Sequence, residues 1–325
     1  MIFRHPKLST WYHQLAQSLE AGLPLSAALR NSRGTGAPAH VLERIAQVIE
    51  SGGTIREALA AADPWMPEAD RLFLDAAAHA GRMPRTLHLL SRRHHQLGAA
   101  SLRVVIGCLY PVAVLHLGLF LLPLARMIDW EKGFTWDTLA YGRGLAFTVI
   151  PIWLALGGLV LLARRPGAVV EKITRLVPIV GRYVRIRALS DFCFGLGNLL
   201  EAGTPIDRAW TTTGAISRDP DLQAAATGIS AIIAQGMPPG PHLADYPCFP
   251  PEFVALYRTG ESSGQLEINL QRLAADTDAQ AQRALTLATV VYPGLMFLAV
   301  AVGVGYFVIS IYSGYLKMLT QLAAP

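Results

Sequence analysis

The stretch LGNLLEAGTPI at residues 196–206 decides the fold, because a variant of it, LAQSLEAGLPL, stands much earlier in the chain at 15–25. In both stretches apolar residues keep a helical spacing up to a glycine, and a proline follows two residues later. A glycine that ends one helix and a proline that opens the next predict a tight helix-to-helix turn. The candidate motif residues of the two turns are Glu20, Gly22, Pro24, Glu201, Gly203 and Pro205.

Two further landmarks recur at nearly the same offset as Leu15 and Leu196. Gly81 matches Gly264, and a Tyr-Pro pair at 110–111 recurs at 292–293. Such constancy indicates an internal duplication. A proline in a helix removes a backbone hydrogen bond, so both helices are predicted to bend here, although membrane helices also tolerate proline without further consequence. The kink candidates are Tyr110, Pro111, Tyr292 and Pro293.

The duplication predicts an all-α fold of two repeated six-helix cytoplasmic bundles and three transmembrane helices. Thr54 is expected to cap the fourth helix of the first bundle and Pro67 to open the fifth. The sixth helix should begin after Gly81 and continue into the membrane. In the second bundle Thr204 should cap a helix, whereas the breaker run PPGP at 238–241 makes the fourth helix doubtful. No period-two alternation predicts a sheet.

Composition places the chain among membrane proteins. Its 325 residues are 52% hydrophobic and only 16% charged, and the mean hydropathy is +0.35. Three uncharged stretches reach or exceed the roughly 20 residues that a bilayer requires. The N-terminus is polar and predicts no secretory signal. The predicted domains are 1–103 (repeat 1), 104–125 (first span), 126–143 (periplasmic loop), 144–163 (second span), 164–283 (repeat 2), 284–316 (a long helix with the third span at about 287–312) and 317–325 (periplasmic tail).

Lysine and arginine set the orientation, because they accumulate on the cytoplasmic side of a membrane. The segment 164–187 carries seven of them against Glu171 alone, whereas the loop 126–143 is balanced. Both repeats and the N-terminus are therefore expected in the cytoplasm of a multi-pass inner-membrane protein. The basic segment is interpreted as a topology signal that contacts the lipid bilayer, and its lack of interleaved aromatic residues argues against direct nucleic-acid binding.

Common catalytic signatures are absent from the sequence. It contains no GxxxxGK[ST], HExxH or GxSxG motif, and its three cysteines are far apart without CxxC spacing, so we expect no enzyme activity, cofactor, disulfide or metal site. His94 and His95 point apart on a helix and, beside Arg92 and Arg93, are interpreted as a solvated cationic face. His116 is ionisable inside a span, and a neutral histidine held by a neighbouring helix is favoured over a proton relay.

Several phrases of repeat 2 carry a family resemblance. They are EAGTPIDRA at 201–209, FPPEF at 249–253, GESSGQL at 260–266 and the Tyr-Pro pair at 292–293. Repeat 1 matches through EAGLPL at 20–25 and GTIREAL at 53–59. The chain thereby resembles the type II secretion system F family, the inner-membrane platform proteins of type II secretion and type IV pilus machines. Repeat 1 has Ala78 in place of the acidic Glu261, which puts an acidic role there in doubt.

The resemblance implies a non-enzymatic role between partners. Those partners would be a hexameric assembly ATPase, pilin or pseudopilin subunits, other inner-membrane assembly proteins and further copies of the chain. Many members carry an extension before the first repeat, and this chain begins almost directly at repeat 1. The ATPase contact is therefore expected to be either reduced or made by the repeat itself. For Glu201 and Glu261 a structural pairing with an arginine such as Arg208 or Arg258 competes with a partner contact. The rival function is a small transporter or channel subunit, and a membrane-anchored hydrolase is weaker.

Overall fold

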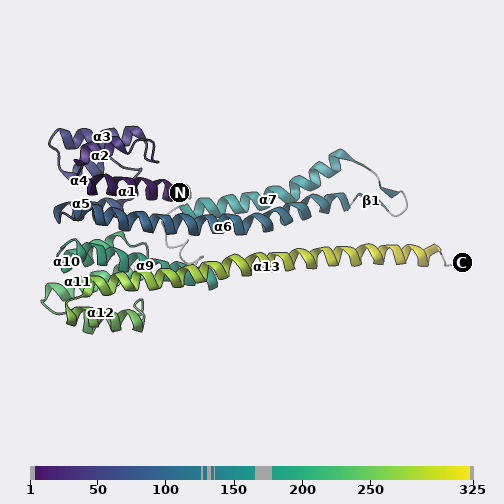
Figure 1. Cartoon of the computed structure of the whole chain (residues 1–325). Coiled ribbons are helices and arrows are strands. Elements are labelled where there is room, and N and C mark those ends of the chain that lie inside the picture. The colour runs from purple at the N-terminus through teal and green to yellow at the C-terminus, as the bar shows by residue number, and fades with distance from the viewer. Residues whose placement is uncertain (1–3, 126, 130–132, 135, 165–177, 323–325) are drawn as a thin grey trace. The chain divides into compact units, whose positions relative to one another are not determined.

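A computed structural model describes residues 4–125, 127–129, 133–134, 136–164 and 178–322. The all-α prediction is confirmed, since helices account for most of these residues (Figure 1). Repeat 1 contains α1 (Arg4–Glu20), α2 (Leu25–Asn31), α3 (Ala39–Glu50), α4 (Ile55–Ala60), α5 (Glu68–His79) and the start of α6 (Met83–Ala125). Repeat 2 contains α9 (Pro178–Glu201), α10 (Ile206–Ile216), α11 (Pro220–Ala234), the 3-10 helix η1 (Gly240–Asp245), α12 (Pro251–Ser263) and the start of α13 (Leu266–Leu322).

The segment between the repeats holds α7 (Thr138–Arg164) and two very short strands, β1 (Ile128–Asp129) and β2 (Gly133–Phe134). The strands pair antiparallel. The expectation of no sheet is therefore wrong in this one place, because strands of two residues are too short to produce an alternating pattern.

Backbone geometry repeats along with the sequence. Gly22 and Gly203 both have positive φ, 83° and 76°, and Gly81 and Gly264 share a φ of 67°. Glycine adopts this left-handed conformation without a Cβ clash, which is why it ends these helices. A side-chain contact recurs too: the hydroxyl of Ser9 donates to the Ser91 carbonyl at 2.9 Å, and that of Ser190 donates to the Ala274 carbonyl at 3.0 Å.

Residues Met1–Leu102 and Arg182–Arg283 form one compact unit, and Arg103–Gly181 with Ala284–Pro325 form another. The first unit thus combines the helical parts of both repeats around a single cluster of buried apolar side chains. Its largest fully buried side chains include Trp11 and Tyr12 from repeat 1 and Trp210 and Tyr257 from repeat 2. The predicted domain boundaries stay predictions.

Of the two threonines predicted to cap helix starts, Thr54 and Thr204, one does so. Thr54 caps α4 as predicted, within a capping box that Glu57 completes. Thr204 does not: Pro205 occupies the cap position of α10, and no side chain bonds the helix end. The doubtful fourth helix of repeat 2 is the short 3-10 helix η1, in keeping with its prolines and glycine.

Within the described part of the chain three helices, α6, α7 and α13, are long and apolar enough to cross a membrane, as predicted. Figure 1 shows α6 and α13 as long uninterrupted ribbons. Both helices run through their Tyr-Pro pairs, at 110–111 and 292–293, and bends at these points stay predictions. Tyr110 is exposed and Tyr292 is half-buried.

Candidate functional site

The two Glu-Ala-Gly turns have the same backbone and different surroundings. The Leu23 amide donates to the Ser18 carbonyl at 3.1 Å, and the equivalent Thr204 amide donates to the Leu199 carbonyl at 2.9 Å. Each turn leads to a proline, Pro24 or Pro205, at the cap position of the next helix. The sequence motif therefore specifies chain reversal in both repeats.

The glutamates of these turns differ. Glu20 is 53% exposed and lies 3.1 Å from the imidazole of His88 in the same repeat. The Glu201 side chain is only 10% exposed; it forms an ion pair with Arg85 and accepts a hydrogen bond from Gln271. Arg85 belongs to repeat 1, so Glu201 joins the two repeats. Glu201 does pair with an arginine, as expected, but the partner is Arg85 and neither Arg208 nor Arg258. The reason is that helix packing brings α6 to the end of α9.

Glu261 holds η1 against α12. Its carboxylate accepts the Gly240 amide at 3.1 Å, and the Arg258 guanidinium donates to the Gly240 carbonyl at 2.9 Å. Partial burial raises the pKa of Glu261, and the Gly240 hydrogen bond and Arg258 oppose that rise. These contacts lie just before Gly264, which ends α12 in the left-handed conformation.

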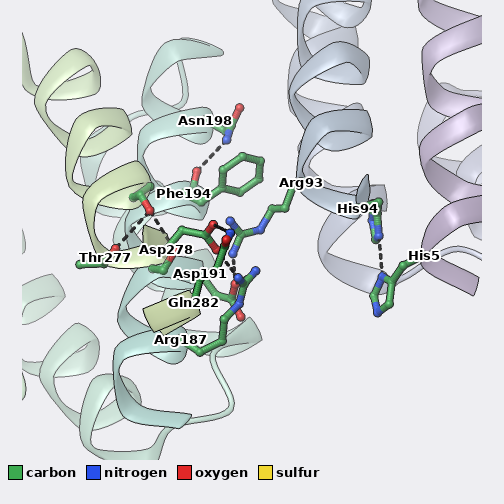
Figure 2. Close-up of polar contacts among 12 residues, drawn as sticks. His5, Arg93, His94, Arg187, Asp191, Phe194, Asn198, Thr277, Asp278 and Gln282 are labelled. Carbon is green, nitrogen blue, oxygen red and sulfur yellow. Dashed lines mark hydrogen bonds and ion pairs between the residues drawn. The ribbon is translucent and has the colours of Figure 1, made fainter. Parts of the chain in front are cut away.

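A cluster of charged side chains lies where the repeats meet, and we call it the charge junction (Figure 2). Arg93 from α6 and Arg187 from α9 both bind Asp191, the second pair at 3.2 Å. Arg187 also binds Asp278 from α13, whose other oxygen accepts a hydrogen bond from Gln282 at 2.7 Å. Two arginines thus face two aspartates, and three helices from both repeats supply them.

The charge junction corrects the expectation of a solvated cationic face around Arg93. The Arg93 side chain is only 11% exposed, and its guanidinium lies 4.3 Å from the centre of the Phe194 ring. Burial, reinforced by the positive charge of Arg187, lowers the pKa of Arg93 to about 9. Arg187 is likewise buried, so this residue of the basic segment binds protein carboxylates. Arg92, one residue away, is exposed as expected.

A second buried polar group lies within repeat 1. His94 bonds the Asp70 carboxylate at 2.7 Å, and the Tyr12 hydroxyl donates to the same oxygen at 2.7 Å. The other nitrogen of His94 lies 2.8 Å from His5, as Figure 2 shows. Burial and the neighbouring His94 lower the pKa of His5 to about 4. His94 is therefore not part of a solvated face; it is a core residue whose nitrogens are both bonded.

His116, in the apolar part of α6, also has a hydrogen-bond partner at each ring nitrogen. Trp153 from α7 donates its indole N–H to Nε2 of His116 at 3.1 Å. Because an indole only donates, Nε2 accepts and Nδ1 carries the proton, which reaches the Val112 carbonyl at 2.6 Å. The predicted contact with a neighbouring helix is confirmed, and the preference for a neutral histidine over a proton relay stays a prediction.

Sequence reasoning missed the charge junction, but one signal of it was present. The buried stripe of α13 runs through Leu270, Ala274, Thr277 and Ala281, and Asp278 lies on that stripe. A carboxylate at such a position requires a buried cationic partner. In the described residues no group of three or more histidines, cysteines or carboxylates could hold a metal ion.

Comparison with known proteins identifies the family to which this chain belongs. The family model for type II secretion system (T2SS) protein F matches residues 11–128 and 192–314, which is most of the chain and both repeats. The chain belongs to the type II secretion system protein F family. The family resemblance of the turn motifs is thereby confirmed.

Three relatives illustrate the range of the family. The chain is 26% identical to the type 4 fimbrial assembly protein PilC of Pseudomonas putida, over 92% of this chain and 80% of that protein. It is 24% identical to type II secretion system protein F of Pseudomonas aeruginosa, over 82% and 71% of the two chains. It is also 24% identical to the protein transport protein HofC homolog of Escherichia coli, over 84% and 74%.

Proposed function

We propose that this chain is a non-enzymatic inner-membrane platform of a type IV pilus or type II secretion machine. It couples a cytoplasmic hexameric ATPase to the extraction and assembly of pilin or pseudopilin subunits. Membership of the family and three membrane-length helices support the platform role. The coupling is our inference from the arrangement of the soluble repeats.

The contact between the repeats is the observation that carries the topology. Arg85 and Phe73 of repeat 1 touch Glu201 and Phe194 of repeat 2, which supports placing both repeats on the same side of the membrane. The chain between them must then cross the bilayer an even number of times, which α6 and α7 provide. The excess of arginine and lysine near these crossings favours the cytoplasm for the shared side, and hence for the N-terminus.

Helices α6 and α13 offer a route for mechanical work. Each begins in the compact soluble unit and continues as an apolar helix of membrane length. The sequence has no phosphate-binding loop, so the work would come from a separate ATPase that acts on the soluble unit. Tilting of the two helices would move the spans that hold the apolar helix of the pilin.

The exposed turn of repeat 1 is the better candidate for partner contact. Glu20 is half-exposed, whereas Glu201 is buried against repeat 1 and Glu261 holds η1. We therefore assign Glu20 with Gly22 and Pro24 to a partner-facing surface, and Glu201 and Glu261 to structural contacts.

The test uses the full chain in proteoliposomes with the assembly ATPase from the same cell. We expect the two to co-purify and ATP hydrolysis to change when the chain is present. The variant Glu20→Ala should weaken this binding at a normal level of folded protein, and Gln17→Ala, an exposed neighbour on α1, serves as the control. Hydrolysis of ATP by the purified chain alone, or no binding by the full chain, would overturn the proposal.

The rival transporter function rests on the intramembrane pair of His116 and Trp153. It requires ion or solute flux through liposomes that contain only this chain. The platform function predicts no such flux, either from the parent chain or from His116→Gln.

A further inference from the structure

The charge junction offers a way to hold the two membrane-entering helices in register. Arg93 lies on α6, Asp278 lies on α13, and α9 contributes Arg187 and Asp191 between them. Each link joins side chains of opposite charge. The ion pairs thus form a chain from α6 through α9 to α13.

We propose that Asp191 is a positioning residue that fixes α6 and α13 relative to each other by binding Arg93 and Arg187 together. This inference deepens the proposed function and rests on it for its cellular consequence. A force applied to either repeat would then displace both membrane-entering helices together.

The cost of burying these charges argues for a positional role. Arg93, Arg187 and Asp278 are nearly buried, and apolar contacts such as Phe73 with Phe194 already join the repeats. Buried ion pairs are seldom more stabilising than apolar side chains of the same size, so stability alone does not explain them. Their directional bonds specify one register between helices, which apolar packing specifies less well.

The charge junction is also not inherited from the duplication. When Leu15 is aligned with Leu196, Arg187 and Asp191 correspond to Pro6 and Thr10. When Gly81 is aligned with Gly264, Asp278 corresponds to His95. Repeat 1 thus has no equivalent set of charges. The junction therefore arose at one boundary only, where α6 meets α9 and α13.

Asp191 is the member that can be removed with least damage to packing. Its side chain is 55% exposed, whereas its two partners are buried. Replacing it by asparagine leaves two arginines facing the single charge of Asp278. Arg93 and Arg187 then repel each other without the shared carboxylate, and the contact between α6 and α9 loosens at the charge junction while Arg85 still pairs with Glu201.

The experiment measures the distance between α6 and α13 in the full chain. Spin labels are attached to cysteines that replace the exposed Gln96 and Gln280, with Cys108, Cys193 and Cys248 changed to alanine. We expect one narrow distance distribution in the parent chain and in Asp191→Glu. Asp191→Asn should broaden it, lower the midpoint of thermal unfolding by about 5–10 °C and reduce pilus or secretion output about tenfold.

A second variant separates positioning from stability. The double change Arg93→Met with Asp191→Leu removes both ion pairs of Asp191 and puts apolar side chains in place of Arg93 and Asp191. Arg187 keeps its pair with Asp278, so the unfolding midpoint should return to that of the parent. The distance distribution should stay broad and the output low. Arg92→Met, at the exposed neighbour of Arg93, is the matched control and should change none of the three readouts.

Two results would overturn the inference: a narrow distribution in Asp191→Asn, or full output from the double variant. Failure of the proposed function has a different signature. In that case the parent chain neither binds the ATPase nor supports output, while the spin-label distances still report on Asp191.

Discussion

The two repeats have the same order of helices and turns, but their buried side chains differ in polarity. Repeat 1 buries Tyr12, Asp70 and His94 as a hydrogen-bonded group. At the corresponding positions of the duplication repeat 2 has Cys193, Phe253 and Thr277. Around them lies an aromatic cluster in which the Phe249 and Phe253 rings stack at 4.5 Å and Trp210 donates to Tyr257 at 3.1 Å.

This difference shows what a helical repeat requires of its core. The turns, set by glycine and proline, are the same in both repeats, whereas the buried contents can be polar or aromatic. A polar core is tolerated because each buried group finds a partner. The stability of repeat 1 should therefore depend on pH and on its buried hydrogen bonds. The stability of repeat 2 should depend on the volume of its buried aromatic side chains.

The largest expected effect is from Trp210→Ala in repeat 2. Trp210 is fully buried, and its removal should lower the free energy of unfolding by about 4 kcal/mol. Leu29→Ala, at the equivalent position of repeat 1, should cost about 3 kcal/mol. Denaturant unfolding of the purified chain in detergent checks both values. A larger loss from Leu29→Ala would reverse the comparison.

Asp70→Asn tests the polar core. The Asp70 carboxylate accepts from both Tyr12 and His94 at one oxygen, and the uncharged amide oxygen of asparagine accepts both hydrogen bonds more weakly. We expect a loss of about 2 kcal/mol in the free energy of unfolding. Asp276→Asn, at an exposed carboxylate, should stay within about 0.5 kcal/mol of the parent. Equal effects of the two changes would show that Asp70 is not a structural acceptor.

Turn glycines should behave alike in the two repeats. A Cβ at Gly22 or Gly203 meets no atom within 4 Å, so only the left-handed backbone opposes alanine. Gly22→Ala and Gly203→Ala should each cost about 1 kcal/mol in unfolding measurements. A cost that differs severalfold between them would contradict the equivalence of the turns.

The smallest expected effect concerns His5, which is only partly buried. The pKa of His5 is about 4 in the folded chain, below the ordinary value of 6.5. The titratable and charged groups that act on it are His94, Asp70 and Arg187. Between these pH values the unfolded chain binds more protons, so stability is fully present above pH 6.5 and falls as the pH drops toward 4. His5→Gln should reduce this fall in thermal unfolding scans, and the exposed His13→Gln should not. An unchanged pH profile in His5→Gln would show that His5 does not carry the effect.

The sequence predicted features that depend on local chemistry. Apolar length identifies α6, α7 and α13, and glycine with proline identifies the turns at Gly22 and Gly203. The charge junction depends on which helices meet, and both membrane crossings separate Arg93 from Asp191 along the chain. The neighbouring Arg92 is solvated, so composition alone could not distinguish the two arginines.

The central claim is that both repeats lie together on the cytoplasmic face. The direct test places single cysteines at Gln17, Asp207 and Asp137 in a chain without other cysteines, and treats intact spheroplasts with a membrane-impermeant maleimide. All three positions are exposed. We predict labelling at position 137 alone, with positions 17 and 207 labelled only after the membrane is permeabilised. Labelling of position 17 or 207 in intact spheroplasts would contradict the account.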